Sequence, residues 1–177
     1  DGYIYKKHGK GTFVSPNRMS QDLQGFYSFT KEMEKLGKTP LSKVLKFEIL
    51  AANNQLITTM KLKEDDLAYK FTRVRLADDI PMIVETTYVP YELFPGITKA
   101  DLNKTPLYDI LFQKFNETIE YANETYLPVL ANEYEAEILD IEVGSPCLKI
   151  TRSTFNKNNL IIEYTVSIAR GDKFKYN

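Results

Sequence analysis

The sequence predicts an α+β fold in which helices pack over an antiparallel β-sheet built from two long hairpins. Residues 62–88 and residues 141–166 repeat one pattern, which is a strand, a polar turn and a returning strand. In both copies eleven positions separate the apolar first residue from an arginine, Arg73 or Arg152, and a glutamate follows twelve or eleven positions later. Such segments form β-hairpins, and two long hairpins can pair into one antiparallel sheet. Coincidence between two ordinary hairpins is the alternative, and the matched Arg and Glu positions argue against it.

The N-terminal residues predict a separate small hairpin with a basic tip. Strand formers at residues 3–5 and 12–14 flank a turn rich in glycine, lysine and histidine. Glycine adopts positive φ readily, so this tip can turn tightly and approach another surface. Its lysines and histidine suit contact with phosphate groups. An ordinary basic surface hairpin is the alternative interpretation.

Proline and glycine residues mark the ends of the next predicted elements. Residues 15–25 are polar and predict a linker. A helix is expected over residues 28–36, because Gly37 follows its last turn and a proline stands three residues beyond. Residues 44–52 then predict a strand, and residues 54–60 predict a short helical turn.

Two more helices and a strand are expected between the two repeated hairpins. After a loop at residues 90–96, a helix is predicted over 106–115, with Thr105 as its N-cap and a proline at its first helical position. Residues 118–126 predict a strand, and residues 128–139 predict a further helix. These elements complete the α+β prediction.

Composition limits where nucleic acid could bind. The 177 residues suffice for one domain with a substantial core plus an appendage, and 43% of them are hydrophobic. Lys and Arg number 23 against 24 Asp and Glu, which gives a formal net charge of -1. A domain that binds nucleic acid is usually basic. We therefore expect DNA contact only at the N-terminal tip.

The few cysteine and histidine residues argue against several kinds of chemistry. Cys147 is the only cysteine, so no intrachain disulfide can form, and a reducing cytoplasm is the expected setting. With one histidine, His8, in a glycine-rich tip, neither a His- or Cys-rich zinc site nor a histidine-based catalytic triad is expected. No apolar run is long enough to span a bilayer. We predict no metal, no cofactor and no catalytic residue.

Several short motifs, in their order and spacing, carry a resemblance to a known family. They are GKGTFV at 9–14, SFT at 28–30, RVRLAD at 73–78, PMIVE at 81–85, TPLY at 105–108, EY at 163–164 and ARGD at 169–172. The chain resembles the UTRA domain, the effector-binding half of the HutC branch of GntR-family transcriptional regulators, whose fold is shared with chorismate lyase. The resemblance covers essentially the whole chain.

The resemblance implies a domain organisation and partners. Residues 1–16 would be the C-terminal hairpin of the wing of a winged-helix DNA-binding domain, otherwise missing here, and residues 17–177 the effector-binding domain. Operator DNA would be bound through that N-terminal domain, a small anionic effector would bind the rest, and the protein would be a homodimer without membrane contact. The wing residues expected to contact DNA are Lys7, His8, Gly9, Lys10 and Gly11.

Arg73 and Arg75 are the strongest candidates for an anion site. They lie two apart on a predicted strand, so both guanidinium groups emerge on one face, together with Tyr69 and Phe71. Arginine binds phosphate or carboxylate in a fork geometry. A solvated face whose arginines pair with acidic residues is the alternative. The resemblance favours the first interpretation and implies that the anionic end of an effector, most commonly a sugar phosphate, binds there.

Further candidates lie at predicted helix starts. Ser28, Phe29 and Thr30 begin the first helix, where exposed N–H groups favour an anion, although plain N-capping is an equal alternative. Thr105 could cap its helix, point into the pocket, or do both. The resemblance adds Tyr108 to this group.

Glu85 and Glu163 occupy matching places in the two hairpins and suit the hydroxyl groups of a sugar, with open solvent as the alternative. The resemblance adds Arg170. At the position of Ala169 the sugar-phosphate-binding relatives often carry tyrosine. One expected ligand contact is therefore missing, and the identity of the effector is left open. Arg152 could be a third ligand contact, but a structural ion pair is the favoured interpretation.

The leading prediction is an effector sensor and not an enzyme. A small anionic metabolite would shift the orientation of a DNA reader attached through the linker, which requires different effector affinities for the two arrangements. One alternative is a chorismate lyase-like enzyme acting on an aromatic carboxylate. Another is a dimerisation module whose pocket has decayed.

Overall fold

A six-stranded antiparallel sheet forms the body of the protein, which confirms the predicted α+β class. The computed structural model describes residues 4–7, 11–14, 19–21 and 29–176. Across the sheet the strands run in the order β4 (Pro40–Ala51), β5 (Leu67–Ala77), β6 (Ile80–Pro90), β9 (Ile161–Arg170), β8 (Pro146–Asn156) and β7 (Ile119–Leu130). The predicted hairpins are thus β5–β6 and β8–β9, and they join through the β6–β9 pair at the centre.

The repeat is longer than the sequence pattern indicates. Each half of the sheet consists of a strand, a short helix and a hairpin: β4–α2–β5–β6 in the first half and β7–α5–β8–β9 in the second. Helices α2 (Asn54–Met60) and α5 (Glu133–Leu139) begin after N-cap asparagines, Asn53 and Asn132, whose side chains accept from backbone N–H groups. The helix expected over 128–139 begins later, because residues 128–130 complete β7 by pairing with β8.

The register of the two hairpins differs, so the two glutamates do not match. Arg73 lies opposite Glu85, whereas Arg152 lies opposite Thr165. Glu163 stands two positions nearer the turn than the residue that faces Arg152. The sequence interpretation of matching glutamates is therefore wrong. The physical reason is the longer connection between β8 and β9, which moves the returning strand along its partner.

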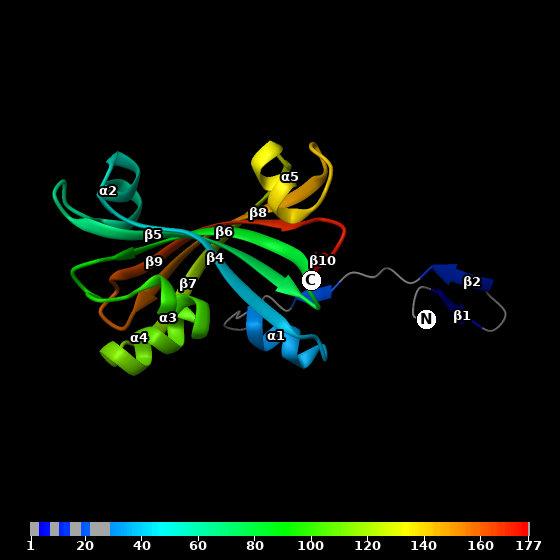
Figure 1. The fold of residues 1–177 in the computed structure, drawn as a ribbon, viewed down its shortest axis with the longest axis horizontal. Helices are drawn as coiled ribbons and strands as arrows, with labels where there is room; N and C mark the ends of the chain where they lie inside the picture. Colours follow the sequence, from blue (N-terminus) through cyan, green and yellow to red (C-terminus); the bar gives the residue numbers. More distant parts are fainter. Residues whose placement is uncertain (1–3, 8–10, 15–18, 22–28, 177) are drawn as a thin grey trace.

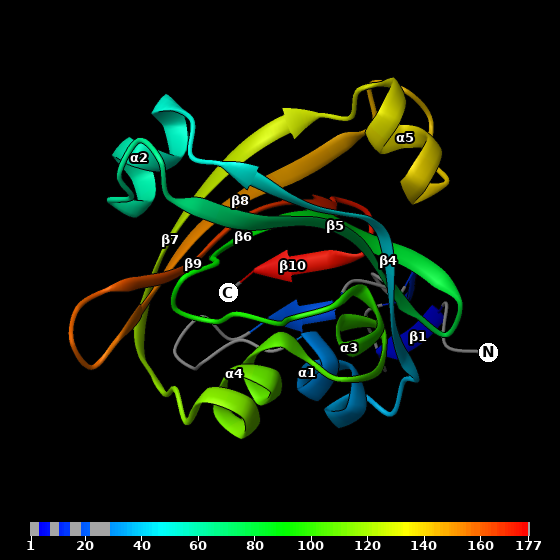
Figure 2. The same cartoon turned by 60° about the vertical axis from the view of Figure 1, so that its left-hand side comes forward.

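The helices cover the sheet from both sides. In Figure 1, α2 and α5 lie on one face, and α1 (Phe29–Lys35), α3 (Lys99–Lys104) and α4 (Leu107–Phe115) lie on the other. Figure 2 shows the same two layers from a second direction. Helix α1 confirms the first predicted helix. Gly37 follows α1 with a φ of 69°, a conformation that favours glycine.

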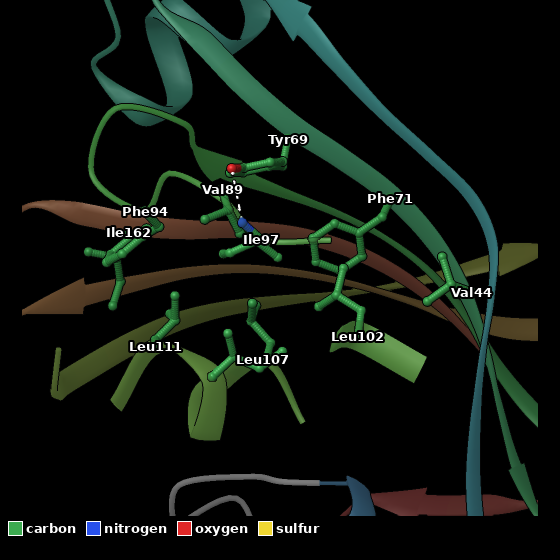
Figure 3. Close-up of a cluster of buried hydrophobic side chains, with 11 residues drawn as sticks. Val44, Tyr69, Phe71, Val89, Phe94, Ile97, Leu102, Leu107, Leu111 and Ile162 are labelled. Carbon is green, nitrogen blue, oxygen red and sulfur yellow. Dashed lines mark hydrogen bonds between the residues drawn. The ribbon is translucent and has the colours of Figure 1, made fainter. Parts of the chain in front are cut away.

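The largest hydrophobic cluster fixes α3 and α4 to the sheet. Tyr69 and Phe71 of β5 pack with Phe94, Leu102 and Leu111, all nearly inaccessible to solvent (Figure 3). The Tyr69 hydroxyl accepts hydrogen bonds from two loop N–H groups at 2.9 and 3.2 Å, so its polar end is satisfied inside the core. This packing holds the start of α4 above the centre of the sheet.

Helix α3 was not expected, and it changes the role of Thr105. Thr98 caps α3 in a capping box with Asp101, and Thr105 ends the same helix by donating its backbone N–H to the Asp101 carbonyl at 2.8 Å. Pro106 is the N-cap of α4 and makes no side-chain cap. The prediction of Thr105 as N-cap is therefore wrong, because its backbone already closes the preceding helix.

At the N-terminus, β1 (Ile4–Lys7) and β2 (Gly11–Val14) pair antiparallel, which confirms the small hairpin. His8, Gly9, Lys10 and Ser28 lie outside the described residues. Within the expected linker, β3 (Met19–Gln21) pairs in parallel with β10 (Phe174–Tyr176), a contact that no local pattern indicates. In the part of the chain that the structure describes, no helix is long and apolar enough to cross a membrane.

Candidate functional site

A cavity of about 80 Å³ lies between the sheet and the helices α1 and α4. Seven of the predicted site residues line it: Phe29, Thr30, Arg73, Arg75, Glu85, Tyr108 and Glu163. These residues come from α1, β5, β6, α4 and β9, and the fold brings them together across more than half of the chain. Thr105 and Arg170 do not line the cavity.

One end of the cavity is cationic. Arg73 and Arg75 both contact the same oxygen of Glu85: Nη2 of Arg73 lies 2.6 Å from Oε1, and Nε of Arg75 lies 2.9 Å from it. The Arg73 side chain is only 3% exposed, and its Nε and Nη1 have no hydrogen-bond partner among the described residues. A buried charged donor without an acceptor is costly. This end therefore carries one positive charge more than its carboxylate neutralises, with unpartnered donors on a residue that lines the cavity.

The pKa values at this end reflect burial and close charges. Burial and the charge of Arg75 outweigh the opposing effect of Glu85 and lower the pKa of Arg73 to about 10, so the side chain is still charged at neutral pH. Burial raises the pKa of Glu85, but Arg75 and Arg73 together outweigh burial and hold it below its usual value. Arg73 and Glu85 are thus both ionised at pH 7.

The apolar wall beside these arginines joins β5 to α1. The guanidinium carbon of Arg73 lies 4.9 Å from the centre of the Phe71 ring, and that of Arg75 lies 5.9 Å from the centre of the Phe29 ring. Contacts of this kind attract a cation to an aromatic face. The start of α1 is therefore in direct contact with the cationic end of the cavity.

A second part of the lining is built around Glu163, whose charge also reaches Arg73 and opposes the lowering of its pKa. Its carboxylate accepts hydrogen bonds from the hydroxyls of Tyr108 at 2.5 Å, Thr154 at 2.7 Å and Thr165 at 2.8 Å. Burial raises the pKa of Tyr108, and the charge of Glu163 raises it further, so the phenol keeps its proton and remains a donor. These contacts fix both Glu163 and Tyr108 at the cavity wall.

Arg152 and Glu124 complete this part of the lining as an ion pair. Nε of Arg152 lies 3.4 Å from Oε1 of Glu124, and the Tyr126 hydroxyl donates to Oε2 of Glu124. Both Arg152 and Glu124 line the cavity. This part therefore holds one arginine and two glutamates, counting Glu163, whereas the part around Glu85 holds two arginines and one glutamate. The formal charges cancel over the whole cavity, with the arginines in excess around Glu85 and the glutamates in excess around Arg152.

Arg170, a predicted site residue, and its neighbour Ala169 have structural roles outside the cavity lining. Arg170 forms a forked pair with Asp172 at 3.0 and 2.8 Å and donates to the carbonyls of Pro81 and Leu139. It thereby ties the end of β9 to β6 and α5. Ala169 is fully buried in a hydrophobic cluster with Phe29 and is not part of the cavity lining.

Sequence reasoning missed several lining residues: Ile83, Pro106, Leu107, Glu124 and Ile150. Glu124 is the most important of them, because it supplies a charge from an edge strand. Alternation along β7 places Glu124 and Tyr126 on one face, which is the signal that could have found them. That Arg152 faces Glu124 in the β7–β8 pair was not visible without the register.

Taken together, a twisted antiparallel sheet with helices on both faces and a cavity lined by arginines and glutamates beneath one layer define a small-molecule-binding domain. The family model of the UTRA domain matches residues 35–175. The chain therefore belongs to the UTRA domain family, as the sequence motifs indicate.

Individual relatives are transcriptional regulators. The chain is 34% identical over 176 residues to the HTH-type transcriptional repressor NagR of Bacillus subtilis (strain 168). This match covers 99% of this chain and 72% of that protein. It is 24% identical over 168 residues to the mannosyl-D-glycerate transport/metabolism system repressor MngR of Escherichia coli (strain K12), covering 95% of this chain and 70% of that protein.

Solved structures agree. PhnF from Mycobacterium smegmatis matches with a TM-score of 0.86 and 21% identity, over 100% of this chain and 77% of that one, which shows a shared fold. A GntR-family transcriptional regulator from Enterococcus faecalis V583 matches with a TM-score of 0.71 and 26% identity, over 77% of this chain and 97% of that one. The protein is an effector-binding domain of the GntR regulator class and not an enzyme.

Proposed function

We propose that this chain is the sensor domain of a bacterial repressor of the HutC subfamily. The effector that it binds is a small anionic metabolite, and a sugar phosphate is the favoured candidate. The observation that carries the proposal is the buried guanidinium of Arg73, which lines the cavity and whose Nε and Nη1 have no hydrogen-bond partner among the described residues. Charge-assisted hydrogen bonds to an oxyanion would satisfy those donors, and arginine is well suited to phosphate. Arg75 and Thr30 also line the cavity and would complete the anion contacts.

The glutamates around Arg152 support a ligand that carries hydroxyl groups. Glu163 and Glu124 accept hydrogen bonds, and the sugar hydroxyls of a phosphorylated ligand are donors of the required kind. The relative named for mannosyl-D-glycerate is also linked to a sugar derivative. A ligand with both an anionic group and hydroxyl groups fits the two kinds of charge within the cavity.

The size of the cavity supports a role for α1 in the response. Its 80 Å³ is well below the roughly 300 Å³ at which ligand-binding pockets begin. A sugar phosphate would therefore need one wall to move, and the wall that α1 supplies through Phe29 and Thr30 is the part nearest in sequence to the hairpin β1–β2. Displacement of α1 by the ligand would change how the preceding segment is held.

The N-terminal hairpin and the dimer complete the proposal. Lys7, His8, Gly9, Lys10 and Gly11 would form the tip of a wing that contacts operator DNA, and the body would be a cytoplasmic homodimer. Palindromic operators require two copies of a reader. The near-neutral body charge agrees with DNA contact limited to the hairpin.

Thermal unfolding with a panel of anions tests this function. The panel contains glucose 6-phosphate, mannose 6-phosphate, fructose 6-phosphate, glucosamine 6-phosphate and citrate, with the unphosphorylated sugars as controls. At about a hundred times its Kd, a true ligand stabilises the protein by about 2.7 kcal/mol. The proposal expects at least one phosphorylated sugar to raise Tm while its parent sugar does not. Equal, small shifts for every compound would contradict it.

A further inference from the structure

The dimensions of the cavity do not exclude inorganic phosphate. One water molecule needs about 10–15 Å³ of space of this kind, so a cavity of about 80 Å³ has room for a small oxyanion. Two arginines stand at one end of it, and one of them has free donors. A sensor of a phosphorylated metabolite would respond poorly if free phosphate filled this end. Something other than size must therefore discriminate between the two.

Glu85 is placed to do so. Its Oε1 lies 2.6 Å from one guanidinium and 2.9 Å from the other, so a single carboxylate engages both arginines of the anion site. A second anion at Arg73 and Arg75 would share them with the negative charge of Glu85. Glu85 is 9% exposed, so water screens this repulsion weakly.

The chemistry of the incoming anion decides how much this repulsion costs. At neutral pH a carboxylate accepts hydrogen bonds and donates none. Inorganic phosphate has at most two hydroxyl donors, and its dianion has one. A phosphorylated sugar carries several hydroxyl groups that lie beside its phosphate and can donate to Glu85. Repulsion from a fixed charge against the wrong ligand is a general means of specificity.

We propose that Glu85 is the selectivity residue that disfavours inorganic phosphate, with its one or two hydroxyl donors, and admits phosphate esters that carry several. This inference rests on the proposed function of the same site. It assigns Glu85 two opposite effects: the carboxylate stabilises the empty protein by neutralising buried arginines, and it weakens the binding of inorganic phosphate to them.

Calorimetric titration of the chain with inorganic phosphate and with glucose 6-phosphate tests the assignment. Glu85→Gln keeps the size of the side chain and removes its charge. We expect this variant to bind inorganic phosphate at least about tenfold more tightly than the wild type, because a repulsive charge close to the site is removed. Its preference for glucose 6-phosphate over inorganic phosphate should fall in parallel.

Glu48→Gln is the matched control. Glu48 forms surface ion pairs with Lys46 and Lys70 on β4 and β5, away from the cavity lining. The substitution makes the same change in net charge and should leave both affinities unchanged. Equal tightening in the two variants would contradict the proposal, because it would make the effect one of net charge.

The decisive outcome is the affinity of Glu85→Gln for inorganic phosphate. Binding no tighter than that of the wild type overturns the proposal. A variant that folds only when phosphate is present supports it, and a variant that stays unfolded in phosphate contradicts it. If the wild type binds no phosphorylated sugar at all, the proposed function fails, while the titration of Glu85→Gln with inorganic phosphate still decides the role of Glu85.

Discussion

The two halves of the sheet share a backbone but differ in the chemistry that they present to the cavity. At equivalent positions β5 carries Arg73 and β8 carries Arg152, yet Arg73 faces Glu85 and Arg152 faces Thr165. Two residues further along, Arg75 on β5 corresponds to Thr154 on β8. The first half thus holds its carboxylate with two guanidiniums, and the second holds Glu163 with three hydroxyls.

The opposite face of the sheet differs in a similar way. Beside α2, the cross-strand pair Tyr88 and Tyr164 stacks with ring centres 6.1 Å apart. Beside α5, the corresponding cross-strand pair is Val84 and Ile168. Helix caps and hydrophobic alternation are therefore sufficient to give both halves of the sheet the same backbone arrangement. A few substitutions on that backbone then place arginines in excess around Glu85 and glutamates in excess around Arg152.

The largest expected effect compares the two equivalent arginines. Arg73→Ala should weaken binding of the best phosphorylated sugar by about a hundredfold, because it removes charge-assisted contacts worth about 1.5–3 kcal/mol each. Arg152→Ala should weaken it by less than about tenfold, since Arg152 already pairs with Glu124. Calorimetry on both variants measures the difference. Equal losses would show that the two arginines do not differ in role.

The next effect concerns how the second half holds its carboxylate. Thr154→Val removes a hydroxyl that donates to Glu163 at 2.7 Å in a fully buried position. The free energy of unfolding should fall by about 1.5–3 kcal/mol, the range for hydrogen bonds to charged groups. Thr151→Val, on the other face of the same strand, is the control and should cost much less. Urea unfolding of both variants measures the two changes in unfolding free energy. Equal losses would refute the special role of Thr154.

A smaller effect tests the likeness of the backbones. Asn53→Ala and Asn132→Ala each remove the side-chain cap of a short helix, α2 or α5. Each should lower the free energy of unfolding by about 1 kcal/mol. Similar losses in urea unfolding would sharpen the comparison, because they would show that both repeats depend on the same device. A loss in only one half would break it.

The smallest expected effect is a dependence of the free energy of unfolding on pH, to which Glu85 in the first half of the sheet contributes. The pKa of Glu85 is lower in the folded protein than the value of about 4.3 for an unfolded chain. Its contribution to stability is therefore complete above that value and is lost as the pH falls through the folded pKa. The difference in unfolding free energy between the wild type and Glu85→Gln should shrink between pH 7 and pH 3. A difference that does not change with pH would contradict this.

Much of the fold could be predicted from the sequence, because alternation, turns and caps are local signals. Such signals are enough to predict the two hairpins and the helices α1 and α2. They also predict that Arg73 and Arg75 lie on the same face of β5. The strand β3 could not be predicted, since three residues acquire their structure only by pairing with β10 at the far end of the chain.

The limits were similar for the candidate site. Arg73, Arg75 and Glu163 could be named from strand parity and the family resemblance. Strand parity could also have named Glu124, but not its pairing with Arg152, which depends on the register between β7 and β8. The role of Arg170 was also hidden, since its carbonyl partners belong to β6 and α5, distant in sequence. Register and long-range packing decide such contacts, and single-strand patterns do not encode them.

The central claim is that Arg73 and Arg75 receive the anion, and arginine side-chain NMR tests it most directly. The chain has only five arginines, Arg18, Arg73, Arg75, Arg152 and Arg170, so their Nε–H signals can be followed individually. Titration with the panel compound that raises Tm most should shift the Nε–H signals of Arg73 and Arg75 to saturation. Binding that leaves these two signals unchanged, or that shifts only those of Arg18 or Arg170, would contradict the account.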